Sequence, residues 1–325
     1  MIVKAVSLFS GGLDSILAVK IIQDQGISVA GLTFSTPFFS AEKAQTTAAR
    51  IGLPLRVFDL TTAHLAMLKA PRYGYGKNMN PCIDCHTLMI HTAGKIMAET
   101  GADFIITGEV LGQRPMSQTR QSLHIVAKNS GYGDYVLRPL SARLLPESEP
   151  ERSGKVNRGL LLSIQGRSRK PQMELAAHYG IQYYPPPAGG CLLTDPMFSR
   201  RLKDLFVNQP DPAPRDMELL KYGRHFRLAA AVKVIVGRNE RDNLALQTLI
   251  REGDAVLKMV DVPGPLVLVP GGGSEEDLRR AARLCVLYSD APPDRESSVK
   301  ATVAGKTTLL TVSAADRDEA ARAIL

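Results

Sequence analysis

The first group of residues that could do chemistry lies near the start of the chain, between an apolar run at 2–9 and a helix-like pattern from Ile16. Its members are Ser10, Gly11, Gly12, Leu13, Asp14 and Ser15. Two adjacent glycines let a ligand approach the backbone closely, and the amides of a strand–turn–helix junction direct a positive dipole to one point. Such a turn suits phosphate. It matches neither a Walker loop, which continues Gly-Lys-Ser/Thr, nor the G-x-G-x-x-G dinucleotide pattern.

The second group consists of cysteines. Cys82 and Cys85 stand three residues apart at the start of a predicted helix, which places both thiols on one side. With His86 they match a haem-attachment motif, but that chemistry requires export, which nothing in the sequence indicates. A zinc site needs a second pair, whereas Cys191 and Cys285 are isolated. The remaining interpretation joins Cys82 and Cys85 to Cys191, which follows a stiff stretch of prolines and glycines at 185–190.

Further candidates lie at predicted strand ends and in loops. Phe34 ends the second predicted strand, where its ring either packs on an adenine or belongs to the core. Gly108 follows the fourth predicted strand, in a position to lie against a nucleotide. Arg114 is a candidate for holding an RNA phosphate, or is simply exposed. A basic loop adds three cations that suit RNA phosphates or form a solvated surface: Arg167, Arg169 and Lys170.

Strand-like and helix-like segments alternate over the first half of the chain. Apolar runs at 2–9, 27–34, 55–58 and 104–107 are separated by residues with helical spacing. This alternation predicts an α/β fold with a doubly wound parallel sheet covered on both faces. Ligands of such sheets bind beyond the carboxyl ends of the strands, where the glycine turn and the candidate strand ends fall.

Composition limits the class of protein. The chain has 325 residues, a net charge of +8 and four cysteines, with a pI of about 9.3. The length allows two domains, and the charge favours a polyanionic partner, nucleic acid first. No run is long enough to span a membrane and the N-terminal run is too short for a signal peptide, so we expect a cytoplasmic protein with no membrane partner. Four cysteines are too few for a disulfide scaffold and favour metal or redox chemistry.

The pattern of elements changes along the chain. We predict a first domain at 1–207, a proline-containing linker at 208–221 and a smaller α+β domain at 222–325. In the second domain, helical spacing is expected from Leu244 and from a capping pattern at Ser274. Cys285 falls in that last apolar helix and is expected in the core.

The glycine turn resembles the PP-loop of ATP pyrophosphatases, whose S-G-G-x-D-S pattern is matched at every fixed position. The resemblance implies that the turn binds ATP, with Asp14 aiding Mg²⁺ or the phosphates, and that an oxygen of the substrate is adenylated. With the cysteines included, residues 1–205 resemble the tRNA thiouridine synthetases, the 2-thiouridylases and 4-thiouridine synthetases. That resemblance implies tRNA as substrate and a separate sulfur donor, sulfide or a carrier of the cysteine desulfurase type.

With cysteine at positions 82, 85 and 191, the chain is similar to the thiouridine synthetases that hold a 4Fe-4S cluster. The resemblance implies that Cys82, Cys85 and Cys191 bind the cluster, leaving one iron open for sulfur. It also makes Asp14, Cys85 and Cys191 the catalytic residues. The Thr-Gly-His-Tyr run common in the 2-thiouridylases is Thr-Gly-Glu-Val here, at 107–110, so the modified uridine is not indicated.

The second domain resembles the RNA-binding domain of the NFACT proteins. The resemblance rests on Val-Gly-Arg-Asn at 236–239, Gly-Asp at 253–254 and Asp-Val-Pro-Gly at 261–264. In the NFACT proteins a tryptophan and a histidine usually follow Gly-Asp. This chain has neither, with Val256 and Lys258 at about those positions. A dimerisation or interaction module is the alternative for this domain.

Three alternatives to a cluster-dependent sulfurtransferase stay open. One is the same thiolation with a persulfide on Cys191 and Cys85 as the resolving thiol. Another keeps the PP-loop chemistry but forms an amide on a small molecule. The third is a non-catalytic RNA-binding or ribosome-associated factor.

Overall fold

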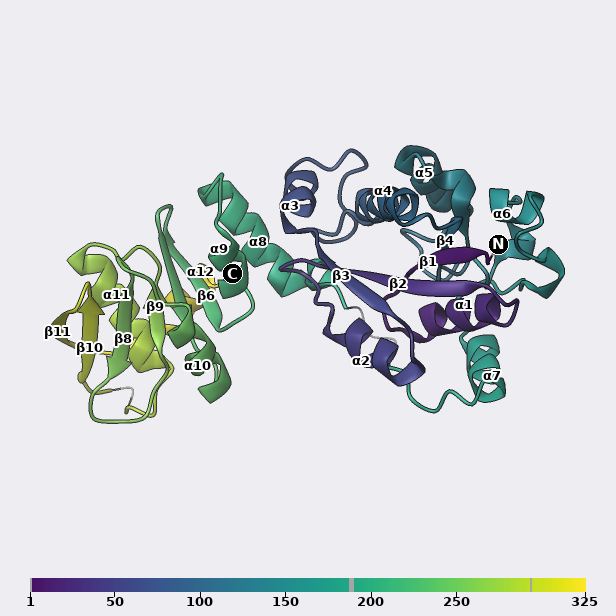
Figure 1. Cartoon of the computed structure of the whole chain (residues 1–325). Coiled ribbons are helices and arrows are strands. Elements are labelled where there is room, and N and C mark those ends of the chain that lie inside the picture. The colour runs from purple at the N-terminus through teal and green to yellow at the C-terminus, as the bar shows by residue number, and fades with distance from the viewer. Residues whose placement is uncertain (1, 187–189, 293) are drawn as a thin grey trace. The chain divides into compact units, whose positions relative to one another are not determined.

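The computed structural model describes residues 2–186, 190–292 and 294–325. They form two compact units that divide between Thr194 and Asp195 (Figure 1). No helix in these ranges combines the length and the apolar character that crossing a membrane requires.

The first unit is built on a five-stranded sheet. The strands are β1 (Lys4–Leu8), β2 (Ser28–Ser35), β3 (Leu55–Asp59), β4 (Phe104–Thr107) and β5 (Val136–Leu137). They are parallel and lie in the order β3-β2-β1-β4-β5. From β1 the chain adds β2 and β3 on one side, then crosses back to add β4 and β5 on the other, so the switch point lies between β1 and β4. The predicted doubly wound α/β fold is confirmed, and ligand sites of such folds lie at this switch point.

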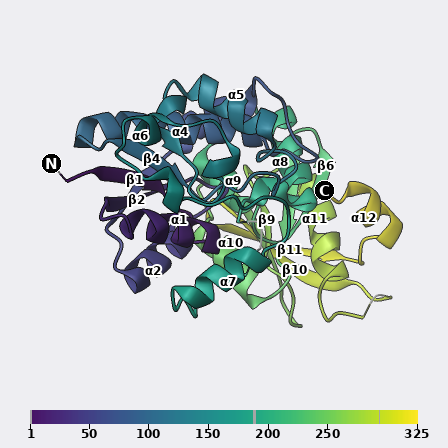
Figure 2. The same ribbon diagram turned by 90° about the vertical axis from the view of Figure 1, so that its right-hand side faces the viewer.

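Helices cover both faces of this sheet (Figures 1 and 2). They are α1 (Leu13–Gln23), α2 (Glu42–Ile51), α3 (Thr61–Lys69), α4 (Cys82–Thr100), α5 (Arg120–Ser130), α6 (Glu149–Arg152) and α7 (Lys170–His178). Helices α1, α2 and α7 lie on one face, and α4 and α5 lie on the other.

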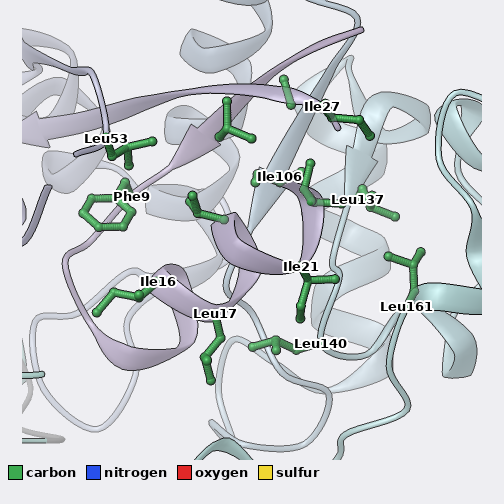
Figure 3. Close-up of a cluster of buried hydrophobic side chains, with 14 of the residues drawn as sticks. Phe9, Ile16, Leu17, Ile21, Ile27, Leu53, Ile106, Leu137, Leu140 and Leu161 are labelled. Carbon is green, nitrogen blue, oxygen red and sulfur yellow. The ribbon is translucent and has the colours of Figure 1, made fainter. Parts of the chain in front are cut away.

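Alternation along each strand divides the core between the two faces. Phe104 and Ile106 of β4 pack with α1, whereas Ile105 between them packs with α4. Figure 3 shows the α1 side, where Leu17 and Ile21 of the helix meet residues of the sheet and of the loops after it. Because successive strand residues point to opposite faces, both faces can be buried only by an apolar run without polar breaks.

The second unit contains a six-stranded antiparallel sheet in the order β11-β10-β8-β9-β7-β6. Its strands are β6 (Arg224–Ala229), β7 (Val232–Val236), β8 (Ala255–Met259), β9 (Val267–Val269), β10 (Ser297–Val303) and β11 (Lys306–Val312). Its helices are α8 (Pro196–Asn208), α9 (Pro214–Leu219), α10 (Glu240–Thr248), α11 (Glu275–Leu287) and α12 (Arg317–Ala323). Cys285 of α11 is fully buried, as expected for a core residue.

The structure differs from the sequence prediction at the boundary between the units. Helix α8 belongs to the second unit although residue 207 was expected to end the first domain. The expected linker at 208–221 contains α9, whose Met217 and Leu219 are buried. Helix α10 begins at Glu240 rather than near Leu244, because the Asn239 side chain accepts a hydrogen bond from the Asp242 amide and caps the helix.

Candidate active site

The glycine turn joins β1 to α1 at the switch point of the sheet. Gly11 has a φ of 71°, and a Cβ there would lie 2.6 Å from the Lys43 carbonyl oxygen, so only glycine fits. Gly12 is the N-cap residue of α1, and no side chain caps the helix. Ser15 Oγ donates to the Gly12 carbonyl at 2.8 Å and closes the turn. The uncapped amides of α1 are therefore available to an anion.

Three cations gather at this turn. Burial, and then the nearby guanidinium groups of Arg114 and Arg169, lower the pKa of Lys43. Arg169 Nε is buried and has no hydrogen-bond partner among the described residues. Like charges held this close repel one another. A bound polyanion would relieve the repulsion, and a nucleotide triphosphate is such an anion.

The loops that carry the two arginines are paired with each other. Leu111 and Gln165 form a parallel bridge, and the Gly166 amide donates to the Leu111 carbonyl at 2.7 Å. This pairing explains how residues 55 positions apart in sequence, Arg114 and Arg169, act on the same lysine.

Asp14 belongs to the same glycine-turn motif and lies in the first helical turn of α1. Gln113 Nε2 donates to its Oδ2 at 2.8 Å, and Gln172 Nε2 donates to Gln113 Oε1 at 3.0 Å. The other carboxylate oxygen, Oδ1, is buried without a hydrogen-bond partner in the described part of the chain. An unsatisfied buried carboxylate oxygen is costly, and a hard cation such as Mg²⁺ would satisfy it.

A buried carboxylate connects this region to the helix that carries two cysteines. Glu109 Oε1 lies 2.9 Å from His86 Nδ1, and Glu109 Oε2 lies 2.8 Å from Arg138 Nε. Burial alone would raise the pKa of Glu109, but the Arg138 charge and the His86 contact outweigh it and lower the pKa to about 2. Glu109 is therefore ionised, and it holds the start of α4 against the end of β4.

The three candidate ligand cysteines lie near one another. Cys82 and Cys85 stand on the first turn of α4. The pKa of the Cys85 thiol is well above its ordinary value, first through burial and then through the negative charges of Cys191 and Cys82. Burial also raises the pKa of Cys191 to about 11, with Cys82 adding to the shift, while the Leu193 amide and Arg114 oppose it. The three thiols are therefore close enough to influence one another electrostatically.

Hydrogen bonds hold the segments that carry the thiols. The Leu192 amide donates to the Phe38 carbonyl at 3.0 Å, and Asn78 Nδ2 donates to the Thr194 carbonyl at 2.7 Å. Asn80 Nδ2 lies 3.2 Å from Cys82 Sγ. Part of the stiff stretch expected before Cys191, residues 187–189, lies outside the described residues.

Sequence comparisons assign each half of the chain. Residues 2–143 match the family model described as "Thiamine biosynthesis protein (ThiI)", and residues 223–323 match "NFACT protein RNA binding domain". Residues 2–143 are therefore similar to a ThiI domain, and residues 223–323 are similar to an NFACT RNA-binding domain.

Curated proteins are similar to part of this chain. A "Probable tRNA sulfurtransferase" of Caldanaerobacter subterraneus subsp. tengcongensis is 31% identical over 141 residues, which are 42% of this chain and 36% of that protein. The corresponding protein of a Thermoanaerobacter species is 30% identical over the same shares. The chain thus matches little more than a third of the length of these relatives.

Among solved structures, a 4-thiouridine synthetase–RNA complex with bound ATP is 24% identical to this chain. The alignment covers 67% of this chain and 52% of that one, with a TM-score of 0.38.

Cys82, Cys85 and Cys191 offer soft thiol ligands, which suit zinc, copper(I) or iron–sulfur clusters. Among the described residues, no group of three or more His, Cys, Asp and Glu side chains converges as a single metal ion requires. A four-iron cluster is wider than one ion and spaces its thiolates accordingly. A donor set made only of thiols favours iron–sulfur clusters over hard cations.

The structure corrects one predicted site residue of the first unit. Phe34 is 4% exposed and packs with Leu60 and Ile90 in the core between the sheet and α4. Its ring offers no face to an adenine, because β2 is covered there. Gly108 lies against the start of α1, since a Cβ on it would be 2.5 Å from the Ser15 amide nitrogen.

The predicted RNA-contact residues separate into two pairs. Arg114 and Arg169 belong to the cation group at the glycine turn. Arg167 and Lys170 are exposed, and Lys170 Nζ lies 3.9 Å from Glu174 Oε1.

Several contributors to the candidate site carry no motif. Lys43, Gln113 and the Glu109–Arg138 pair were not singled out from the sequence. The one signal was the acidic residue directly after Thr107-Gly108, in place of the expected histidine. His64 was also missed: it is fully buried, and its Nε2 lies 3.5 Å from Cys85 Sγ.

Proposed function

We propose that the chain is an ATP-dependent tRNA sulfurtransferase that adenylates a uridine carbonyl and replaces its oxygen with sulfur. The observation that carries the proposal is the position of Arg114. Its charge acts both on Lys43 at the glycine turn and on Cys191 among the thiols. The glycine turn and the thiols are therefore both within electrostatic range of Arg114, which supports a nucleotide site next to a sulfur site.

In the first step, the PP-loop positions ATP and the uridine oxygen attacks its α-phosphorus. The bond to the bridging oxygen breaks and pyrophosphate leaves. The uncapped amides of α1, with Lys43, Arg114 and Arg169, stabilise the negative charge that grows on the leaving phosphates. Asp14 holds Mg²⁺ through Oδ1, while Gln113 fixes the other oxygen.

In the second step, sulfur at the sulfide level attacks the ring carbon, and AMP leaves with the original oxygen. Cys82, Cys85 and Cys191 would hold a 4Fe-4S cluster, which would supply iron as the binding site for that sulfur. The target uridine must leave its stack to reach the site. Arg167 and Lys170, both exposed, are proposed to contact the tRNA backbone.

One observation favours a second route to the same product. Cys85 Sγ lies 3.5 Å from His64 Nε2, a contact that a proton-exchanging thiol would use. In this route a sulfur carrier delivers a persulfide to Cys191, and Cys85 attacks its inner sulfur and releases hydrosulfide to the ring carbon. The Cys85–Cys191 disulfide that remains is reduced by an external thiol, and no cluster is involved.

Iron and acid-labile sulfide separate these routes. They would be measured, with the absorbance spectrum, on protein purified without oxygen, for wild type and for single alanine variants of Cys82, Cys85 and Cys191. Cys285→Ala is the matched control, because this thiol is buried in the second unit. Loss of iron in the three variants but not in the control supports the cluster. Absence of iron from the wild type, with activity dependent on Cys85 and Cys191 alone, supports the persulfide.

Catalysis is tested with bulk tRNA and ATP. Pyrophosphate release and thiolated nucleosides would be measured for wild type and Asp14→Asn. We expect both products from the wild type and at least about a 100-fold loss in the variant. Tight tRNA binding without either product would instead support a non-catalytic RNA-binding factor.

A further inference from the structure

One face of the sheet in the second unit is only partly covered. Side chains of β8, β10 and β11 that point to α11 are buried in the core: Leu257, Val299 and Leu310. The alternate residues, Lys258, Lys300 and Leu309, point the other way and are exposed. On that other face, α10 packs over β7 and β9 through Leu246, Ile235 and Leu268. The half formed by β8, β10 and β11 therefore stays open beside α10.

The open half carries two lysines directly opposite each other. Lys258 of β8 pairs in register with Lys300 of β10. Neither lysine forms an ion pair with any acid in the described residues. Like charges at directly opposed strand positions are destabilising, so the pair carries a cost that a bound anion would relieve.

A depression of about 230 Å³ lies at the α10 side of this open half. It is lined by Glu240, Asn243, Leu244, Gln247, Lys258, Met259, Gly264, Pro265 and Leu266. Leu244 is 59% exposed, so it offers an apolar surface to an occupant rather than to the core.

Polar groups for recognition line the same depression. Asn243 Oδ1 accepts from the Leu266 amide at 3.0 Å, which fixes the side chain and leaves its NH₂ group without a partner among the described residues. The Gln247 amide, one helical turn later, forms no hydrogen bond to them either. Paired amide groups match the donors and acceptors of a base edge, and the Glu240 carboxylate can accept from a base amino group.

We propose that this face binds single-stranded RNA, with one unstacked base in the depression and a neighbouring phosphate on Lys258 and Lys300. The inference rests on the proposed function only in taking RNA as the polymer that the chain handles. A planar base accounts for the apolar wall and the amides, and the phosphate next to it accounts for the lysine pair. An acidic peptide would account for the lysines alone.

Binding by the full chain would be measured by fluorescence anisotropy, with labelled single-stranded RNA oligonucleotides over a range of salt concentrations. The variants are Lys258→Gln, Lys300→Gln and Gln247→Ala, all at exposed side chains. Arg317→Gln, which removes one charge from the first turn of α12, is the matched control. Thermal unfolding followed by circular dichroism checks that each variant folds.

Each lysine variant should weaken binding by about 5-fold or more and reduce the slope of log K against log salt by about 0.7. Gln247→Ala should weaken binding by about 5-fold or more with the salt slope unchanged, because an amide releases no counterions. The control should match the wild type.

Wild-type binding in all three variants would overturn the proposal. Loss in the lysine variants with no change in Gln247→Ala, or equally effective displacement of RNA by polyglutamate, would overturn the base site. Thiolation of tRNA is assayed in parallel. If the wild type makes no thiouridine but the variants lose RNA binding, the proposed function alone is refuted. If the wild type thiolates tRNA but the variants bind RNA as well as the wild type does, this inference alone is refuted.

Discussion

Replacement of Glu109 by glutamine removes the charge that holds β4 to α4 while keeping the size of the side chain. The pKa of Glu109 falls from 4.5 to about 2 on folding, which corresponds to about 3 kcal/mol at about 1.4 kcal/mol for each pH unit. Breaking a buried ion pair and leaving its partner unpaired costs about 3–5 kcal/mol. Arg138 is 7% exposed and would be that partner. We therefore expect the first unit of Glu109→Gln to lose about 3 kcal/mol near pH 7.

Hydrogen exchange in increasing urea, followed by mass spectrometry, measures this loss in the first unit alone. Peptides covering residues 100–115 report the opening of β4. Glu174→Gln is the matched control, because Glu174 is exposed and faces Lys170 at 3.9 Å. A substitution at such a surface pair changes stability by about 0.5 kcal/mol or less.

The pH dependence supplies an independent check. A carboxyl group whose pKa is lowered on folding contributes its full stability above the unfolded pKa and loses it as the pH falls through the folded pKa. The difference in the free energy of unfolding between wild type and Glu109→Gln should thus be constant above about pH 5. It should shrink as the pH falls from 4.5 to about 2. A variant as stable as the wild type at pH 7, or a difference that persists unchanged at pH 2, would refute the reasoning.

Three further predictions concern single side chains. Gly108→Ala puts a Cβ 2.5 Å from the Ser15 amide nitrogen; it should cost about 1–3 kcal/mol and weaken ATP binding in calorimetry, whereas Gly190→Ala, with open space around it, should do neither. Lys43→Met should weaken ATP binding by about 10-fold. Since phosphate favours protonated Lys43, wild-type affinity should fall as pH rises through the lowered pKa of Lys43, and the variant should lack this fall in calorimetry across pH. Arg215→Met leaves buried Asp254 without its ion-pair partner and should cost the second unit about 3–5 kcal/mol, measured by hydrogen exchange of peptides at 250–256; unchanged exchange would contradict it.

Local patterns were sufficient to predict the parallel sheet and the phosphate turn. Strand, glycine pair and helix follow one another within residues 4–23, so neighbouring residues alone determine the turn. Cys191 was linked to Cys82 and Cys85, although it is far from them in sequence, because isolated thiols need a common explanation. Their joint role as ligands stays a prediction.

Contacts made over long sequence distances were not predictable. Arg138 meets Glu109 only because β5 lies beside β4, and a buried arginine looks the same in sequence as an exposed one. Lys43 lacks a motif and acquires its role from the loops of Arg114 and Arg169. Phe34 stayed undecided because an aromatic residue at a strand end can face a ligand or the core, and only the packing against α4 places it in the core.

Gly108 and Glu109 are adjacent, yet they serve opposite faces of the sheet. Gly108 admits the start of α1 on one face, and Glu109 anchors α4 on the other through His86. Deleting one residue from β4 would place the carboxylate against the glycine turn, whereas inserting one would place the glycine where an arginine needs a counter-charge. The length of this strand should therefore be invariant through evolution, whereas insertions can accumulate in the surface loops.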